Sequence, residues 1–196
     1  YRLKAHFIDA MPEDLGLLGE HQRANAALAA MAVQLFGNST IIDQNAIFEG
    51  ARNVVWPARM QRLKDGPLTA LAPNQEIWLD GGHNPHAARA IARLLNNMPG
   101  RTALVAAMLA SKDATGYFMP FRQVRPEVFT LPNAPGHQGA EPQALAEAAT
   151  NAGLKAAAYD TLEAAHMAAA TTAADAVLMY ADVQTAVHVA EQHTVA

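Results

Sequence analysis

The clearest sign of architecture in this chain is Leu79-Asp80-Gly81-Gly82-His83-Asn84-Pro85. A brief apolar run at residues 77–79 predicts a strand that ends at Asp80. Asn84 can cap a helix whose first position is Pro85, and this helix is expected to run to about Asn97. The stretch therefore predicts a strand, a glycine turn and a helix in direct succession.

The segments downstream repeat this alternation. Apolar runs predict strands at residues 102–108, 127–131, 156–159 and 176–181. Helical spacing predicts helices at residues 113–124, with a break near Pro120, and at residues 142–152, 162–174 and 184–192. Such alternation implies right-handed crossovers, so we expect an α/β fold: a Rossmann-like, doubly wound, mainly parallel sheet with helices on both faces.

A sheet of this kind binds ligands beyond the carboxyl ends of its strands. That rule selects three loops here, at residues 80–84, 109–113 and 181–184. Functional side chains are therefore expected to gather at one edge of the sheet.

Upstream of this region the pattern differs. Residues 3–8 predict a short strand, residues 22–35 an amphipathic helix, and residues 40–49 a short helix. Trp56-Pro57 and Gly66-Pro67 punctuate the segment between this helix and the strand at residues 77–79. We place a domain junction near residues 45–56 and divide the chain into two parts, residues 1–50 and 51–196.

Composition excludes several classes of function. Of 196 residues, 51% are hydrophobic and 16% charged, so disorder is not expected, and no apolar run is long enough for a membrane helix. The net charge of −4 argues against a broad nucleic-acid-binding face. The absence of cysteine excludes disulfides, thiolate metal sites and a cysteine nucleophile. The chain starts at Tyr1 without a signal pattern, and we expect it to begin inside a longer polypeptide.

The glycine turn carries the most informative polar residues. The Asp80 carboxylate suits the paired hydroxyls of a ribose, His83 and Asn84 follow it, and the amino terminus of the next helix favours an anion. The alternative is that Asp80 and Asn84 only satisfy local amides. His83 and His86 could form a metal pair, but no further ligand stands at a suitable spacing, so no metal site is predicted.

Three other segments offer ligand-binding groups. His21 and Asn25 lie one helical turn apart and could read a base edge, or His21 and Gln22 could cap the helix while Asn25 packs against a neighbour. Arg59 could bind phosphate through its planar fork, or belong to a solvated segment. Lys112 could hold a carboxylate or phosphate, or Asp113 beside it could merely cap a helix.

Taken in order, these pieces resemble the C-terminal half of the folylpolyglutamate synthase/dihydrofolate synthase family, within the Mur ligase superfamily. Four segments, spread over nearly all of the chain, carry the resemblance: Leu18-Gly-Glu-His21-Gln22-x-x-Asn25-Ala26, Trp56-Pro-Ala-Arg59-Met-Gln61, Leu79-Asp80-Gly-Gly-His83-Asn84-Pro85 and Met108-x-x-x-Lys112-Asp113.

The resemblance implies an ATP-dependent ligase. Such an enzyme activates a pteroate or folate carboxylate as an acyl phosphate, which the amino group of L-glutamate attacks, with Mg²⁺ assisting. ATP and Mg²⁺ are held mainly by an N-terminal P-loop domain, and this chain contains no G-x-x-x-x-G-K-[ST] loop. Residues 1–50 are then the tail of that ATPase domain plus a linker, and the chain alone is expected to be inactive. The resemblance also implies a monomeric, cytoplasmic enzyme of folate and one-carbon metabolism, with no nucleic-acid or membrane partner.

Site residues follow from the resemblance position by position. His21 and Asn25 resemble the adenine side, Arg59 the phosphate-reaching arginine, and Asp80, His83 and Asn84 the nucleotide contacts. Arg59 and Lys112 are the catalytic candidates, with Lys112 expected near the glutamate or the domain interface.

The chain departs from the family pattern at three places. Ala58 and Ala107 replace glycines, and Ala181-Asp182 stands where relatives tend to have Gly-Ser. A carboxylate at position 182 would repel an amino-acid carboxylate, which puts glutamate handling there in doubt. A non-catalytic nucleotide- or phosphometabolite-binding α/β module is the alternative function, and a plain structural domain is the third.

Overall fold

The computed structural model describes residues 8–36, 43–133, 138–172 and 175–180. The chain forms two compact units, Tyr1–Trp56 and Pro57–Ala196. Of the strand predicted at residues 3–8 only Ile8 is described, and it lies in a helical turn. The loop at residues 181–184 and the helix predicted at residues 184–192 lie outside the described residues.

The first unit is built on two helices, α2 (Glu20–Phe36) and α3 (Gln44–Asn53). The helix predicted at residues 22–35 is confirmed as α2. The short helix predicted at residues 40–49 corresponds to α3, which is described from Gln44. The side chain of Asp43 accepts a hydrogen bond from the Ala46 N–H at 2.7 Å and so caps this helix. The small core of this unit is formed by Met11, Ala27 and Ala30 with four partly buried neighbours, Ile8, Ala26, Ile47 and Phe48.

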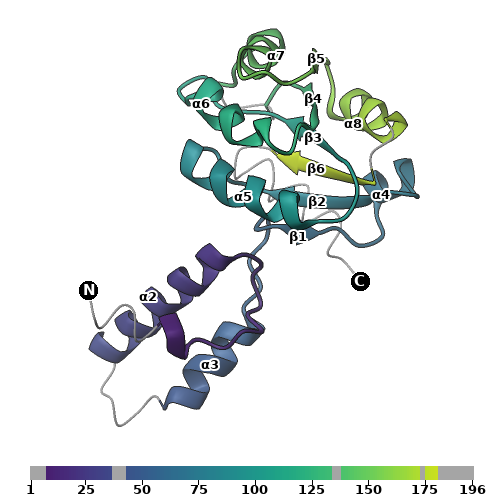
Figure 1. The fold of residues 1–196 in the computed structure, drawn as a ribbon. Helices are drawn as coiled ribbons and strands as arrows, with labels where there is room; N and C mark the ends of the chain where they lie inside the picture. Colours follow the sequence, from purple (N-terminus) through teal and green to yellow (C-terminus); the bar gives the residue numbers. More distant parts are fainter. Residues whose placement is uncertain (1–7, 37–42, 134–137, 173–174, 181–196) are drawn as a thin grey trace. The chain divides into compact units, whose positions relative to one another are not determined.

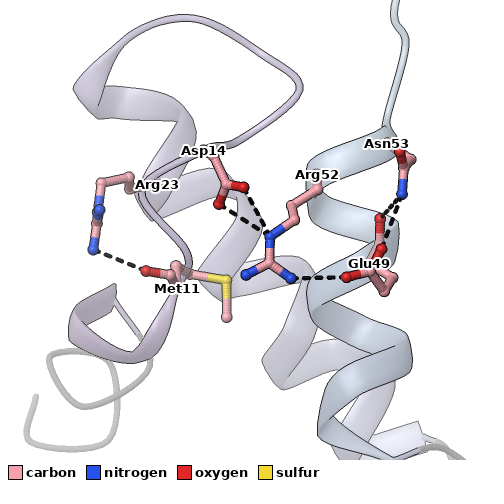
Figure 2. Close-up of polar contacts among 6 residues, drawn as sticks. All are labelled: Met11, Asp14, Arg23, Glu49, Arg52 and Asn53. Atoms are coloured by element: carbon pink, nitrogen blue, oxygen red, sulfur yellow. Dashed lines mark hydrogen bonds and ion pairs between the residues drawn. The ribbon is translucent and has the colours of Figure 1, made fainter.

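Two arginines connect the loop before α2 to these helices (Figure 2). The Nε of Arg52 donates to both carboxylate oxygens of Asp14 at 3.0 and 3.1 Å, and its Nη1 donates to Glu49 at 2.8 Å. On the other side of the loop, Arg23 donates to the carbonyl oxygen of Met11 at 3.0 Å. The hydrogen bond from Arg52 holds the pKa of Asp14 below its ordinary value. Because both partners are exposed, this pair contributes little to stability.

The second unit is a six-stranded sheet in the order β1-β2-β6-β3-β4-β5 (Figure 1). Its strands are β1 (Gln61–Arg62), β2 (Glu76–Asp80), β3 (Thr102–Ala106), β4 (Glu127–Thr130), β5 (Ala156–Ala158) and β6 (Ala176–Tyr180). Every neighbouring pair is parallel except β1 and β2. The mainly parallel sheet is therefore confirmed, whereas β1 was not predicted.

Most helices of this unit lie where the sequence predicts the connections between parallel strands. They are α4 (Pro67–Leu71), α5 (Pro85–Asn97), α6 (Ala114–Phe118), the 3₁₀ helix η1 (Met119–Arg122), α7 (Pro142–Asn151) and α8 (Leu162–Thr171). The break near Pro120 is confirmed, because α6 ends at Phe118 and the chain continues through Pro120 as a 3₁₀ turn. Helix α4 was not predicted, since Gly66-Pro67 was interpreted only as a turn. No helix among the described residues is both long and apolar enough to cross a membrane.

Strand β3 shows how the two faces of the sheet are covered. Ala103 and Val105 belong to one buried cluster, which also contains Ala165 and Ala169 of α8. Leu104 and Ala106 belong to the other cluster, which contains residues of α5, α6 and α7. The alternation along one strand places helices on both faces, and the doubly wound arrangement is confirmed (Figure 1).

The register of the central strands defines the carboxyl edge of the sheet. Asp80 at the end of β2 pairs with Tyr180 of β6, which in turn pairs with Ala106 at the end of β3. The loops after β2 and β3 therefore leave the sheet at the same level. This is the edge at which the sequence places its ligand-binding groups.

The packing of helix α8 predicts that a larger side chain is destabilising at one of two neighbouring alanines and tolerated at the other. Ala165 is completely buried against the sheet, whereas Ala164 is exposed. Ala165→Leu forces extra methylene groups into a packed core and is expected to lower the free energy of unfolding by about 1–3 kcal/mol. Ala164→Leu is expected to change it by less than about 0.5 kcal/mol. Urea unfolding followed by circular dichroism measures both, and equal effects of the two variants would contradict this packing.

The Asp14–Arg52 pair predicts a pH dependence confined to the first unit. Since the pKa of Asp14 is lowered in the folded state, the pair stabilises the unit above the carboxyl's unfolded pKa, and this stabilisation is lost as the pH falls through the folded pKa. In Arg52→Gln the Asp14 pKa is expected to rise toward its ordinary value. NMR titration of the Asp14 carboxyl in the parent and in the variant checks this. An unchanged Asp14 pKa in the variant would show that Arg52 is not its cause.

Candidate functional site

The turn between β2 and α5 forms as the sequence predicts. Asn84 has an extended backbone, and its Oδ1 accepts a hydrogen bond from the Ala87 N–H at 2.9 Å, so it caps α5. Pro85 occupies the first turn of the helix, where a missing N–H costs nothing. The predicted cap is confirmed, and the amino terminus of α5 opens at the carboxyl edge of the sheet.

The Asp80 carboxylate is buried, and backbone amides from two segments converge on it. Its Oδ2 accepts a hydrogen bond from the Met60 N–H at 2.9 Å, and its Oδ1 accepts one from the Gly82 N–H at 2.6 Å. Only 6% of the residue is exposed. Asp80 therefore accepts from an amide of its own turn and from one in a distant segment, so the carboxylate joins the loop before β1 to the turn after β2, and its binding to a ligand stays a prediction.

Gly82 is required by this close approach. A Cβ atom at position 82 would lie 2.8 Å from the Oδ1 of Asp80 and 2.8 Å from the Cβ of Ala87. Any side chain there would push the carboxylate away from the turn. The absence of a side chain at Gly82 thus makes room for the Asp80 carboxylate itself.

Arg59 lies on a loop with unusual backbone geometry. Ala58 and Met60 have φ values of 56° and 43°, in the left-handed region that few non-glycine residues adopt. Their side chains are buried in different clusters, one on each face of the sheet. Arg59 stands between them, partly exposed, and its Nη1 donates to the carbonyl oxygen of Ala58 at 3.2 Å. The interpretation of this segment as simply solvated is wrong, because the residues on either side of Arg59 are core residues.

A second hydrogen bond fixes the same loop to the turn. The Gly81 N–H donates to the carbonyl oxygen of Ala58 at 2.9 Å, and the Ala58 N–H donates to the side chain of Gln61 at 2.9 Å. The structure therefore brings together the Arg59 loop and the Asp80 turn, two segments that are about twenty residues apart in the sequence.

His83 and His86 differ in their surroundings. The Nδ1 of His83 lies 3.3 Å from the carbonyl oxygen of Gly81, and the ring is partly buried, whereas His86 is exposed on α5. Within the described parts of the chain, no group of three or more histidine, aspartate and glutamate side chains could hold a metal ion.

Lys112 follows β3 at the same edge of the sheet. Its backbone N–H donates to the carbonyl oxygen of Leu109 at 3.1 Å, and Asp113 beside it caps α6 by accepting from the Gly116 N–H at 2.8 Å. The capping role of Asp113 is confirmed. Among the described residues the ammonium group of Lys112 has no hydrogen-bond or ion-pair partner, so it is available to an anionic ligand. Ala107 is completely buried, and Asp182 lies outside the described residues.

Asn133 is a polar residue at this edge that was not predicted from the sequence. It follows β4, and both polar atoms of its side chain are shielded from solvent without a hydrogen-bond partner in the described structure. A buried amide of this kind offers donor and acceptor groups to a ligand. The topological rule that selected the loops after β2, β3 and β6 applies equally to the loop after β4, and would have found it.

His21 and Asn25 lie in the first unit and are connected by a residue between them. Asn25 donates to the Oε1 of Gln22 at 2.9 Å, and the Nε2 of Gln22 lies 3.0 Å from the Nε2 of His21. Helix α2 begins at Glu20, so His21 and Gln22 belong to its first turn. Gln22 and Asn25 also line a cavity of about 550 Å³ between α2 and α3, whose other walls are mostly apolar and include Trp56. Polar amides at an apolar cavity suit a flat ligand with a polar edge.

Comparison with known proteins supports a family assignment. Residues 58–189 match the sequence model of the family described as "Mur ligase, glutamate ligase domain". The chain is 28% identical over 146 residues to folylpolyglutamate synthase of Lacticaseibacillus casei, an alignment that covers 72% of this chain and 32% of that protein. It is 31% identical over 124 residues to dihydrofolate synthase/folylpolyglutamate synthase of Mycobacterium tuberculosis, covering 61% of this chain and 24% of the relative.

Solved structures show the same likeness. A structure of E. coli FolC in complex with DHPP and ADP matches with a TM-score of 0.67 and 26% identity, over 92% of this chain and 40% of that one. A Mycobacterium tuberculosis folylpolyglutamate synthase complexed with ADP matches with a TM-score of 0.76 and 24% identity, over 93% of this chain and 42% of that one, and shows the fold. The chain thus spans less than half the length of these proteins.

The two hydrogen bonds to Asp80 predict that removing its carboxylate destabilises the backbone around Met60 and Gly82. Asp80→Ala leaves the amides of Met60 and Gly82 without their acceptor, and the free energy of unfolding is expected to fall by about 2–4 kcal/mol. Hydrogen exchange measured by NMR is expected to show those two amides losing protection first. Asp65→Ala removes the same charge from an exposed position and is the matched control, with an expected effect below about 0.5 kcal/mol. Unchanged protection of the Met60 amide would contradict the hydrogen bond between Met60 and Asp80.

Proposed function

The chain belongs to the Mur ligase, glutamate ligase domain family, and we propose that it forms the C-terminal part of an ATP-dependent ligase. In this proposal the ligase joins glutamate to dihydropteroate or folate. The carboxylate of the pterin substrate takes the γ-phosphoryl group of ATP and ADP leaves; the amino group of glutamate then displaces phosphate and forms the amide. Relatives named as folylpolyglutamate and dihydrofolate synthases support this substrate class.

The first unit is proposed to be the tail of a P-loop ATPase domain that lies upstream. The chain contains no G-x-x-x-x-G-K-[ST] loop of its own and matches only about a third of the Lacticaseibacillus casei enzyme. Helix α2 leaves Leu28, Leu35 and Phe36 exposed, by 49%, 78% and 92%. Apolar side chains exposed to this degree on one helix suit packing against further protein.

ATP and Mg²⁺ are proposed to bind mainly to that upstream domain. The described residues of this chain include no cluster of acidic or histidine side chains able to hold the metal. What the second unit offers to ATP is cationic and dipolar: the guanidinium of Arg59 and the amino terminus of α5 beside His83 and Asn84. These groups suit a polyphosphate. His21 and Asn25 are proposed to contact the adenine.

The observation that carries the proposal is the way Arg59 is held. Its loop is fixed by the Asp80 carboxylate and by two buried neighbours with left-handed backbones, so the guanidinium starts from a rigid base. An arginine held in this way can stabilise the charge that spreads over a transferring phosphoryl group without reorganising. Asp80 is then first a positioning residue, and it is also proposed to lie near a ribose hydroxyl of the bound ATP.

Lys112 is proposed to act on the other reactant. It stands two strands away from Asp80 at the same edge, where a free cation suits the carboxylate of the incoming glutamate. Asn133 adds donor and acceptor groups on the next strand. The parent enzyme is proposed to be monomeric and cytoplasmic, and to have small molecules as its only substrates.

The test compares three proteins: the full product of the gene that encodes this chain, its Arg59→Ala variant, and the 196-residue chain alone. Ligation of radiolabelled glutamate to dihydropteroate is measured with ATP and Mg²⁺. The full product is expected to be active, and Arg59→Ala is expected to lower kcat at least about 100-fold, because a preorganised charge contact to the transition state is lost. The chain alone is expected to give no turnover.

Arg62→Ala is the matched control, since Arg62 is an exposed arginine of the same segment that pairs with Glu76 at 2.7 Å. Its kcat is expected to stay within about twofold of the parent. ATP-dependent turnover by the chain alone would refute the need for an upstream P-loop domain. A full product that binds ATP but ligates neither dihydropteroate nor folate would favour the non-catalytic binding module.

A further inference from the structure

A cationic pocket lies at the edge of the sheet opposite to the proposed active site. It has a volume of about 390 Å³ and is lined by five charged residues, Arg101, Arg122, Arg125, Lys155 and Glu127, and by the uncharged Pro126, Gly153 and Leu154. Arg101 immediately precedes β3, Glu127 begins β4, and Lys155 immediately precedes β5. The pocket therefore sits at the amino-terminal ends of three adjacent parallel strands.

The charges around this pocket are unbalanced. Glu127 is the only carboxylate among its lining residues, and Lys155 already pairs with it at 2.6 Å. The guanidinium groups of Arg101, Arg122 and Arg125 have no hydrogen-bond or ion-pair partner in the described part of the chain. Asp175 lies close by, but its Oδ2 accepts the backbone N–H of Arg101 at 2.9 Å. Three planar donors thus face one cavity on a protein whose net charge is −4.

Backbone geometry at Gly153 allows Arg122 to lie close to the main chain in this pocket. Gly153 has a φ of 84°, and a Cβ atom at that position would lie 3.3 Å from the Nε of Arg122. The guanidinium of Arg122 therefore lies over bare backbone. Arg125 itself has a left-handed backbone, with a φ of 52°. The volume of the pocket falls within the range of about 300–1,000 Å³ that is usual for small-molecule sites.

We propose that this pocket is a second ligand site, which binds a small polyanion carrying two or more carboxylate or phosphate groups. Guanidinium groups form paired hydrogen bonds with both kinds of oxyanion, and the charge of three of them is matched best by a ligand with more than one anionic group. The strands that separate the two edges are four or five residues long, or about 13–17 Å. A ligand in this pocket therefore does not compete for the groups around Arg59.

A purely structural role for these arginines makes a different prediction. Helix η1 ends at Arg122 and α7 ends nearby at Asn151, and cations stabilise the carboxyl ends of helices. If that were their whole function, replacing them would lower the melting temperature and no polyanion would bind. Binding and stability must therefore be measured on the same proteins.

The experiment is isothermal titration calorimetry on the 196-residue chain at low ionic strength. Pyrophosphate and a γ-linked triglutamate are the two probes, and they distinguish a phosphate ligand from a carboxylate ligand. At least one probe is expected to bind with a stoichiometry of one. The double variant Arg122→Gln/Arg125→Gln is expected to raise the Kd of that probe at least about tenfold, because two charge-assisted contacts are lost. Thermal melting followed by circular dichroism establishes that each variant is folded.

Two controls make the result specific. Arg89→Gln/Arg93→Gln removes the same charge from exposed positions of α5 and is expected to change the Kd by less than about twofold. Arg59→Gln, at the opposite edge, is also expected to leave the Kd unchanged. Should the double variant not fold, Arg101→Gln alone replaces it, with an expected increase in Kd of at least about threefold. The proposal is overturned if neither probe binds, if both double variants weaken binding equally, or if Arg59→Gln abolishes it.

Discussion

The geometry of the candidate site in the second unit depends on the two hydrogen bonds that the buried Asp80 carboxylate accepts. At the end of a parallel strand the backbone leaves its ladder, and the amides there need other acceptors. Asp80 supplies them for Gly82 in its own turn and for Met60 in a loop twenty residues earlier. That second bond positions the short antiparallel strand β1 at the edge of the sheet, because Gln61 follows Met60 directly and pairs with Leu79.

The two edges of the sheet have opposite electrostatic requirements, and the chain meets them in different ways. Helices α5 and α6 begin at the carboxyl edge, where the positive ends of their dipoles favour anions. The amino edge receives the carboxyl ends of η1 and α7, which favour cations, and here the charge comes from arginine and lysine side chains. At the carboxyl edge the helix dipoles therefore add to the attraction that a single cation such as Lys112 has for an anion. At the other edge they stabilise a cluster of cations that would otherwise repel one another.

Local signals in the sequence were sufficient for most of the fold. Asn84 before Pro85 fixes the start of α5, and Pro120 fixes the end of α6, because each effect acts within one helical turn. Strand β1 has two residues and no periodicity, and it exists only because β2 pairs with it. Helix α4 begins at a proline that serves equally well in a turn. These two elements could not be predicted because their stability comes from distant neighbours.

In the candidate site, too, local features could be predicted from the sequence and contacts between distant residues could not. The residues of the Asp80 turn could be located from the sequence, but the partnership of Asp80 with Met60 could not, since it requires left-handed backbones at two non-glycine residues. Alanine at position 58 is a useful case. The left-handed conformation costs an alanine about 1–2 kcal/mol. Burying its methyl group returns about 0.8 kcal/mol, and avoiding the conformational entropy of glycine returns about 0.5–1 kcal/mol. These contributions nearly cancel, so the completely buried Ala58 can keep the left-handed backbone that precedes Arg59. Alanine at position 58 is therefore compatible with the loop geometry on which the proposed role of Arg59 depends.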